Sequence, residues 1–230
     1  MASATAEPIV IAGDDGIGVS GLLQSPRGAR ACYVLAHGAG AGMRHPFMAA
    51  VAGGLAERGV ATLRYQFPYM ERGSKRPDPP RIGQAAVRTA VAAAASALPG
   101  LPLIAGGKSF GGRMTSQAQA AAPLPDVCGL AFLGFPLHPP VRPSADRAAH
   151  LSDVKIPMLF LQGTRDAFAE LDRLRPVCDA LGARATLTLF QDADHSFHVP
   201  ARTGRRDAEV LREVLDALAD WLDGLLRGTP

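Results

Sequence analysis

Residues 101–112 read LPLIAGGKSFGG, an apolar run that ends in a glycine-rich turn around Ser109. The turn matches the pattern G-x-S-x-G, with a strand-like run before it and a helix-forming stretch after it. A chain that turns so sharply needs small residues on both sides of the serine, and paired glycines supply them. This setting is typical of a nucleophile elbow, in which the serine oxygen is exposed and the next helix points its N-terminus at it.

Outward from this turn, short apolar runs alternate with longer Ala-rich or amphipathic stretches, which is the rhythm of strands and crossover helices. This rhythm predicts one α/β domain over residues 1–230, with a mostly parallel eight-stranded sheet and helices on both faces. We expect residues 1–8 to form a flexible N-terminal tail and the first two strands to pair as an antiparallel edge hairpin. The expected strands are 9–12, 19–24, 31–37, 60–65, 101–107, 128–135, 157–163 and 185–190. The expected helices are 46–58, 81–98, 111–122, 168–181 and 205–226.

Two proline-rich segments, residues 66–80 and 136–152, carry no helix or strand signal. Segments of this length are longer than plain connections and often hold functional residues. Ordinary surface loops are equally compatible with the length, so their role stays open.

A second glycine-rich turn, HGAGAG at residues 37–42, follows an expected strand. Acyl transfer at a serine requires two backbone N–H groups that bind the oxyanion, one just after the nucleophile and one from a loop of this kind. We predict Phe110 and Ala39 as these two donors, with Gly40 as the alternative to Ala39.

Other known motifs fit these glycine-rich turns less well. The end of the first turn also looks like a phosphate-binding P-loop, but that motif needs a glycine where this chain has Pro102. The second turn fails as a dinucleotide-binding G-x-G-x-x-G because Met43 occupies the third glycine position. We interpret His37 as a structural brace of its loop. A simple strand-to-helix turn remains the plain alternative for Ser109.

A serine hydroxyl becomes a good nucleophile only when a general base takes its proton, and the base needs a carboxylate to hold its tautomer. Asp166 and His195 each follow an expected strand, so both lie at the edge of the sheet where Ser109 lies. The order along the chain is that of a nucleophile-elbow enzyme. We therefore predict Ser109, Asp166 and His195 as a catalytic triad. The alternatives are His138, His150 and His198 for the base and Asp192 and Asp194 for the acid.

Six segments carry a family resemblance, namely HGAGAG at 37–42, FPYM at 67–70, KRP at 75–77, GKSFGG at 107–112, GTRD at 163–166 and DHSF at 194–197. Together they resemble the dienelactone-hydrolase-like branch of the α/β-hydrolases, and within it the hydrolases akin to the testis-expressed and NSL-complex-subunit proteins. The resemblance implies an α/β-hydrolase domain without a large cap domain, and a hydrolase with an oxyanion hole. Gln66 stands where the family has Asn, and Ser109 stands where dienelactone hydrolases proper have Cys. Dienelactone chemistry is therefore not expected.

Hydrolysis of carboxylic esters with small or medium acyl groups, through a Ser109 acyl-enzyme, is the leading hypothesis. A thioesterase, a lactonase or a small peptidase would use the same residues, and a noncatalytic interaction protein of the same fold is the alternative of another class. Arg44, Lys75 and Arg76 are cations that would attract a carboxylate or phosphate on a substrate. The predicted substrate-binding residues are Gly40, Met43, Phe67, Tyr69, Phe135, Phe168 and Phe197.

Composition excludes several other classes of protein. The formal charge of +3 is spread along the chain rather than gathered in a stripe, so we expect no nucleic-acid partner. Cys32, Cys128 and Cys178 lack the spacing of a disulfide framework or a zinc site, and neither a metal nor a cofactor is expected. No segment is apolar for long enough to predict a signal peptide or a membrane span. We expect a cytoplasmic protein, a monomer or homodimer, acting on a small-molecule ester.

Overall fold

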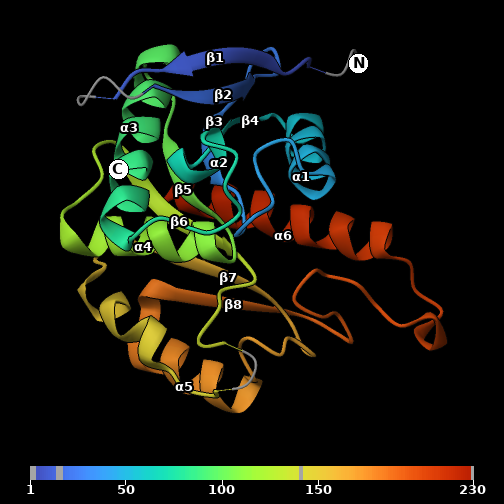
Figure 1. The fold of residues 1–230 in the computed structure, drawn as a ribbon. Helices are drawn as coiled ribbons and strands as arrows, with labels where there is room; N and C mark the ends of the chain where they lie inside the picture. The colour runs from blue at the N-terminus through green and yellow to red at the C-terminus, as the bar shows by residue number, and fades with distance from the viewer. Residues whose placement is uncertain (1–3, 14–17, 140–141, 229–230) are drawn as a thin grey trace.

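Eight strands form one sheet in the order β1-β2-β4-β3-β5-β6-β7-β8 within residues 4–13, 18–139 and 142–228, which the computed structural model describes (Figure 1). Strands β3 to β8 are parallel, whereas β1 and β2 form an antiparallel hairpin that joins the edge of β4. The predicted sheet and its edge hairpin are confirmed. The strands are β1 (Glu7–Ile11), β2 (Val19–Gln24), β3 (Ala31–Ala36), β4 (Val60–Tyr65), β5 (Leu103–Lys108), β6 (Val127–Leu133), β7 (Met158–Gly163) and β8 (Ala185–Phe190).

Helices cover both faces of this sheet, as the sequence predicts. Apolar side chains of α1 and α6 pack on one face, and those of α3, α4 and α5 pack on the other. Strand β3 shows the alternation that makes this possible, because Tyr33 and Leu35 point to the first face while Cys32 and Val34 point to the second. The helices are α1 (Pro46–Glu57), α2 (Pro68–Glu71), α3 (Pro80–Ala97), α4 (Phe110–Ala121), α5 (Leu171–Leu181) and α6 (Asp207–Arg227), with 3-10 helices η1 (Asp146–Asp153), η2 (Gly182–Arg184) and η3 (Ala201–Thr203).

Helix α6 is the longest of the described helices and follows the predicted amphipathic pattern. Val210, Val214, Leu218 and Leu222 recur at helical spacing and are buried against the sheet. None of the helices in the described ranges is both long enough and apolar enough to cross a membrane.

The structure differs from the sequence-based prediction in the N-terminal tail, in the two proline-rich segments and at the start of α5. The flexible tail predicted for residues 1–8 is wrong at its end, because Glu7 and Pro8 pair with Leu23 and Leu22 in the hairpin, and residues 1–3 lie outside the described part. The segment 66–80 contains the short helix α2, and 136–152 contains most of η1, although residues 140 and 141 lie outside the described part. Helix α5 begins three residues later than the predicted start at 168, since residues 164–170 form the connection that carries Asp166.

Candidate active site

Ser109 follows the last residue of β5 and occupies the cap position before α4. Its backbone has φ +50°, a left-handed conformation that is uncommon for a residue with a side chain, as a strained elbow requires. The glycines around it are needed because backbone passes very close. A Cβ atom on Gly107 would stand 2.1 Å from the carbonyl oxygen of Ala36, and one on Gly111 would stand 2.6 Å from the same oxygen. The sequence therefore folds this turn only with glycine at these positions.

Ser109, His195 and Asp166 form a continuous chain of hydrogen bonds. The side-chain oxygen Oγ of Ser109 lies 2.8 Å from Nε2 of His195, and Nδ1 of the same ring lies 2.6 Å from Oδ2 of Asp166. The three residues come from the carboxyl ends of β5, β8 and β7, which lie at one edge of a parallel sheet. The structure thus brings together the three residues that the sequence predicts as a triad.

The carboxylate of Asp166 is buried and accepts hydrogen bonds from three groups. Besides His195, the side-chain amide of Gln162 donates to Oδ2 at 2.5 Å and the backbone N–H of Phe168 donates to Oδ1 at 2.8 Å. Gln162 is itself oriented by the backbone N–H of Phe135, which donates to its side-chain oxygen at 2.9 Å. These bonds hold the carboxylate in one position facing the imidazole.

The ring of His195 is held in the neutral form at neutral pH. Burial lowers its pKa below the ordinary value of 6.5, and the hydrogen bond that the ring donates to Asp166 opposes this shift. A neutral ring that donates from Nδ1 to Asp166 leaves a lone pair on Nε2, which faces the Ser109 hydroxyl. The ring of Phe168 packs against the imidazole, with 4.3 Å between the two ring centres. The arrangement is able to take a proton from Ser109.

The glycine-rich turn after β3 is braced on both sides by side chains. Nδ1 of His37 lies 2.7 Å from the carbonyl oxygen of Gly38, and Nε2 accepts from the backbone N–H of Phe67 at 3.2 Å. Burial lowers the pKa of His37 to about 4, which keeps the ring neutral and lets one nitrogen accept while the other donates. This bonding agrees with the interpretation of His37 as a structural brace. Gln66, which stands in place of the family's Asn, accepts from the backbone N–H of Met43 at 2.9 Å.

The structure separates the two alternatives for the second backbone donor. The N–H of Gly40 donates to the hydroxyl oxygen of Tyr69 at 3.1 Å, so it is already occupied. Within the described residues, the N–H groups of Ala39 and Phe110 have no hydrogen-bond acceptor. Of the two alternatives, Ala39 is therefore the one whose backbone donor is available.

Most of the predicted substrate-binding residues belong to the core instead of a pocket wall. Phe135 is fully buried and packs edge-to-face against Phe132 and Phe160, which makes it part of the core under β6 and β7. Apolar side chains next to a site are as easily core as pocket lining, and burial decides between the two. Met43, Phe67, Tyr69 and Phe197 are buried as well, whereas Gly40 and Phe168 are partly exposed.

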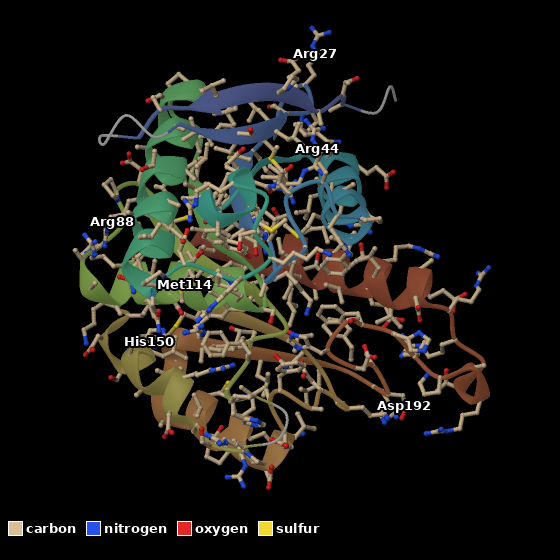
Figure 2. All side chains as sticks on the ribbon, in the orientation of Figure 1. Arg27, Arg44, Arg88, Met114, His150 and Asp192 are labelled. Atoms are coloured by element: carbon tan, nitrogen blue, oxygen red, sulfur yellow. The ribbon has the colours of Figure 1, made fainter. Side chains whose placement is uncertain are left out.

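The loop that contains α2 places its cations beside the glycine-rich turn. Arg72, Ser74, Arg76 and the residues 77–79 line an open hollow of about 570 Å³. A Cβ atom on Gly40 would stand 3.6 Å from the carbonyl oxygen of Lys75, so the two loops touch. Arg44 is exposed beside α1 (Figure 2). Arg72 is paired with Asp78 at 2.5 Å, which leaves Arg76 as the cation of the hollow without a carboxylate partner among the described residues.

The alternative histidines and acids have other partners. His138 pairs with Glu170, His150 lies 2.7 Å from Oγ of Ser116, and His198 lies 2.9 Å from Asp207. Figure 2 shows His150 and Asp192 at opposite sides of the molecule. Asp194 accepts from the backbone N–H groups of Ser196 and His198, which is a local loop bond. No group of three or more His, Cys, Asp or Glu side chains in the described chain is arranged to hold a metal ion.

Sequence reasoning missed two residues that contact this site. Gln162 is a buried polar residue at the end of the apolar run MLFLQG, and a polar side chain in such a run is a signal that it has a specific partner. Lys108 lies inside the G-x-S-x-G turn and donates to the backbone carbonyl of His195. The chain has only three lysines, so a lysine beside the nucleophile is a noticeable feature of the sequence. The contact itself could not be predicted, because its partner His195 lies 87 residues away.

Residues 29–223 match a protein family described as the alpha/beta hydrolase domain. Among solved structures, the chain is similar to a dienelactone hydrolase from Anabaena variabilis, with 20% identity, a TM-score of 0.77, and 97% of this chain and 99% of that chain covered. It is also similar to an alpha-beta serine hydrolase homologue from Coxiella burnetii, with 19% identity, a TM-score of 0.74, and coverage of 94% and 98%. A third is the esterase domain of a Rhodothermus marinus protein, with 16% identity, a TM-score of 0.70, and coverage of 94% and 97%. At these identities the three structures share the fold.

Proposed function

Because this chain belongs to the α/β-hydrolase domain family, we propose that it is a serine hydrolase that cleaves carboxylic esters with small or medium acyl groups. The family match and the shared fold confirm the predicted superfamily and its dienelactone-hydrolase-like architecture. The observation that carries the proposal is the hydrogen-bonded chain from Ser109 through His195 to the buried Asp166. An ordinary structural histidine does not require a strained serine at a strand end as its partner.

In this proposal Ser109 Oγ attacks the ester carbonyl while Nε2 of His195 takes the hydroxyl proton. The carbonyl oxygen becomes an oxyanion that accepts from the N–H groups of Ala39 and Phe110, and each such donor contributes about 3 kcal/mol to transition-state stabilisation. When the tetrahedral intermediate collapses, His195 returns the proton to the departing alkoxide, which leaves as the alcohol. A water molecule then gives a proton to His195 and attacks the acyl-enzyme. His195 returns that proton to Ser109 Oγ as the acid leaves, which restores the free serine and the neutral ring.

Support for esters as the substrate comes from the relatives and from the openness of the site. One similar structure is an esterase domain, and the described residues form no large cap domain over the sheet edge. Thioesters, lactones and small peptides are cleaved by the same sequence of steps, so these remain alternatives, as does an interaction protein that has kept the residues. We further propose a cytoplasmic protein that acts as a monomer or homodimer on a small-molecule ester, without a nucleic-acid partner.

Pre-steady-state hydrolysis of p-nitrophenyl acetate and butyrate tests the proposal. A rapid release of about one equivalent of p-nitrophenol per chain is expected before the slower steady rate, because p-nitrophenol is a good leaving group and acylation is then faster than the attack of water on the acyl-enzyme. Mass spectrometry of the quenched protein should find the acyl group on the peptide that contains Ser109. Steady release without any covalent acyl group, or the group on another residue, would contradict the acyl-enzyme route.

The pH dependence of ester hydrolysis provides a second prediction. His195 acts as a base only when unprotonated, and its pKa lies below 6.5 because of burial. Raising the pH through that pKa removes the ring proton, so kcat/KM should rise along an acid limb with a midpoint below 6.5 and be level at neutral pH. A steady-state profile with the midpoint above 6.5 would show that the base is another group or that the ring is more exposed.

A further inference from the structure

Lys108 is the residue immediately before Ser109, and its side chain contacts two other loops around the site. A Cβ atom on Gly38 would stand 3.5 Å from the Cγ atom of Lys108, so the lysine stem passes along the glycine-rich turn. At its end, the ammonium group donates to the backbone carbonyl oxygen of His195. It also lies 5.6 Å from the ring centre of Phe197, within the reach of a cation–π contact.

The ammonium group of Lys108 is buried beside carboxylates that it does not contact directly. Among the described residues, Lys108 forms no direct ion pair with a carboxylate. Burial lowers its pKa to about 8, against the attraction of the Asp166 and Asp194 carboxylates. Removing a cation from water without a paired anion costs free energy, and a methionine or leucine of similar volume would avoid the cost. We therefore expect the Lys108 ammonium group to have a role other than packing.

His195 lies in a long connection that regular structure does not hold in place. Between the end of β8 and the start of α6, the only helical turn in the described chain is η3, which comes after His195. Locally the segment is a tight turn, in which Phe197 has φ +63° and its N–H donates to Asp194. The contact from Lys108 ties this turn to the strand that carries the nucleophile.

We propose that Lys108 is a positioning residue, whose ammonium group holds the backbone of His195 so that Nε2 of the ring faces Oγ of Ser109. The proposal rests on the proposed function, since it assigns His195 as the base. Lys108 and Ser109 are adjacent in the chain, so one strand end sets both the nucleophile and the anchor of its base. Misplacement of a catalytic group by a fraction of an ångström is costly, because proton transfer requires a near-linear short contact.

The same charge has an electrostatic consequence for His195. The Lys108 ammonium group lowers the pKa of the His195 ring, while the Asp166 and Asp194 carboxylates raise it. These three are the charged groups that act on the ring, and the aromatic rings of Phe168 and Phe197 add no charge. Loss of the Lys108 charge is therefore expected to raise the pKa of His195, which a residue that only fills space would not do.

The test compares Lys108→Met, which keeps the length and removes the charge, with Lys108→Arg, which keeps a charge and donors. Lys155→Met is the matched control, because Lys155 donates to the backbone carbonyl of Ser152 at 3.1 Å on an exposed surface. We expect Lys108→Met to lower kcat for p-nitrophenyl butyrate by about 10- to 100-fold with little change in KM, the range for loss of a charge-assisted hydrogen bond. NMR titration of the His195 ring should give a higher pKa in Lys108→Met than in the wild type. Lys108→Arg should recover part of kcat, and Lys155→Met should match the wild type.

A Lys108→Met protein with wild-type kcat and an unchanged His195 pKa would overturn the proposal. The NMR titration does not depend on turnover. A wild type without esterase activity would contradict the proposed function, and the pKa of His195 in Lys108→Met would still test the role of Lys108. If Lys108→Met does not fold, a comparison of kcat at high pH between the wild type and Lys108→Arg tests the proposal instead. The wild-type kcat should fall above a pH of about 8 as the ammonium group loses its proton, and Lys108→Arg should not show this fall. Identical alkaline profiles of the two proteins would overturn the proposal.

Discussion

Replacement of His195 by alanine is expected to lower kcat/KM for a p-nitrophenyl ester by about 10⁴- to 10⁶-fold. The ring is the one described base within hydrogen-bond distance of Ser109 Oγ, so without it the serine proton has no acceptor during attack. The contacts on both ring nitrogens, with Asp166 at Nδ1 and Ser109 at Nε2, support the proposed role of His195 as the base. Steady-state kinetics on the purified variant measures the loss.

His198→Ala is the control for this substitution. His198 lies three residues further along the same loop, is exposed, and pairs with Asp207 at 2.9 Å instead of with Ser109. Its removal should leave kcat/KM within a few-fold of the wild type, since an exposed pair contributes on the order of 1 kcal/mol or less. Equal losses in the two variants, or a His195→Ala protein that keeps a tenth of the activity, would remove His195 from the mechanism.

Asp166→Asn is expected to reduce kcat/KM by about 10⁴-fold while the fold is retained. The carboxylate accepts from Nδ1 of His195 and so selects the tautomer whose Nε2 is free to receive the serine proton. Oδ2 accepts from both His195 and Gln162, so an asparagine whose NH2 group takes that position presents donors to both and holds the ring in the wrong tautomer. In the reversed orientation the NH2 group faces the backbone N–H of Phe168, which is also a donor. Steady-state kinetics together with thermal denaturation separates loss of catalysis from loss of folding.

Asp192→Asn is the matched control for this second substitution. Asp192 is the alternative acid in the loop before His195, and its backbone has φ +61°, which asparagine tolerates well. The variant should therefore fold and hydrolyse the ester as the wild type does. If Asp192→Asn lost the activity and Asp166→Asn kept it, the acid of the site would have to be reassigned.

The framework of the site was predictable because it depends on local patterns. Strands β2, β4 and β8 have the predicted bounds, and strand ends are where the sequence places Ser109, Asp166 and His195. The glycines of the elbow are visible for a similar reason, since close backbone approach leaves no substitute for them. The alternation of strands and helices and the order of residues along the chain were therefore enough to predict most of the fold and the positions of Ser109, Asp166 and His195.

Contacts between distant segments were not predictable from one sequence. Whether Phe135 lines a pocket or fills the core depends on Phe132 and Phe160, and the chain pattern is the same in both cases. Helix α2 is a single turn that begins at Pro68, too short to produce a periodic pattern. The choice between Ala39 and Gly40 likewise depended on the hydroxyl of Tyr69, which lies 29 residues from Gly40.

Labelling with a fluorophosphonate probe tests the central claim most directly, because the reagent reacts with a serine that is activated by a general base. The account predicts rapid labelling of the wild type, with the phosphonyl group on the peptide that contains Ser109. It predicts no labelling of Ser109→Ala, which should fold with the same thermal stability to within a few degrees. A folded wild type that does not react, or a Ser109→Ala protein that labels as fast as the wild type, would contradict the claim that Ser109 is the nucleophile.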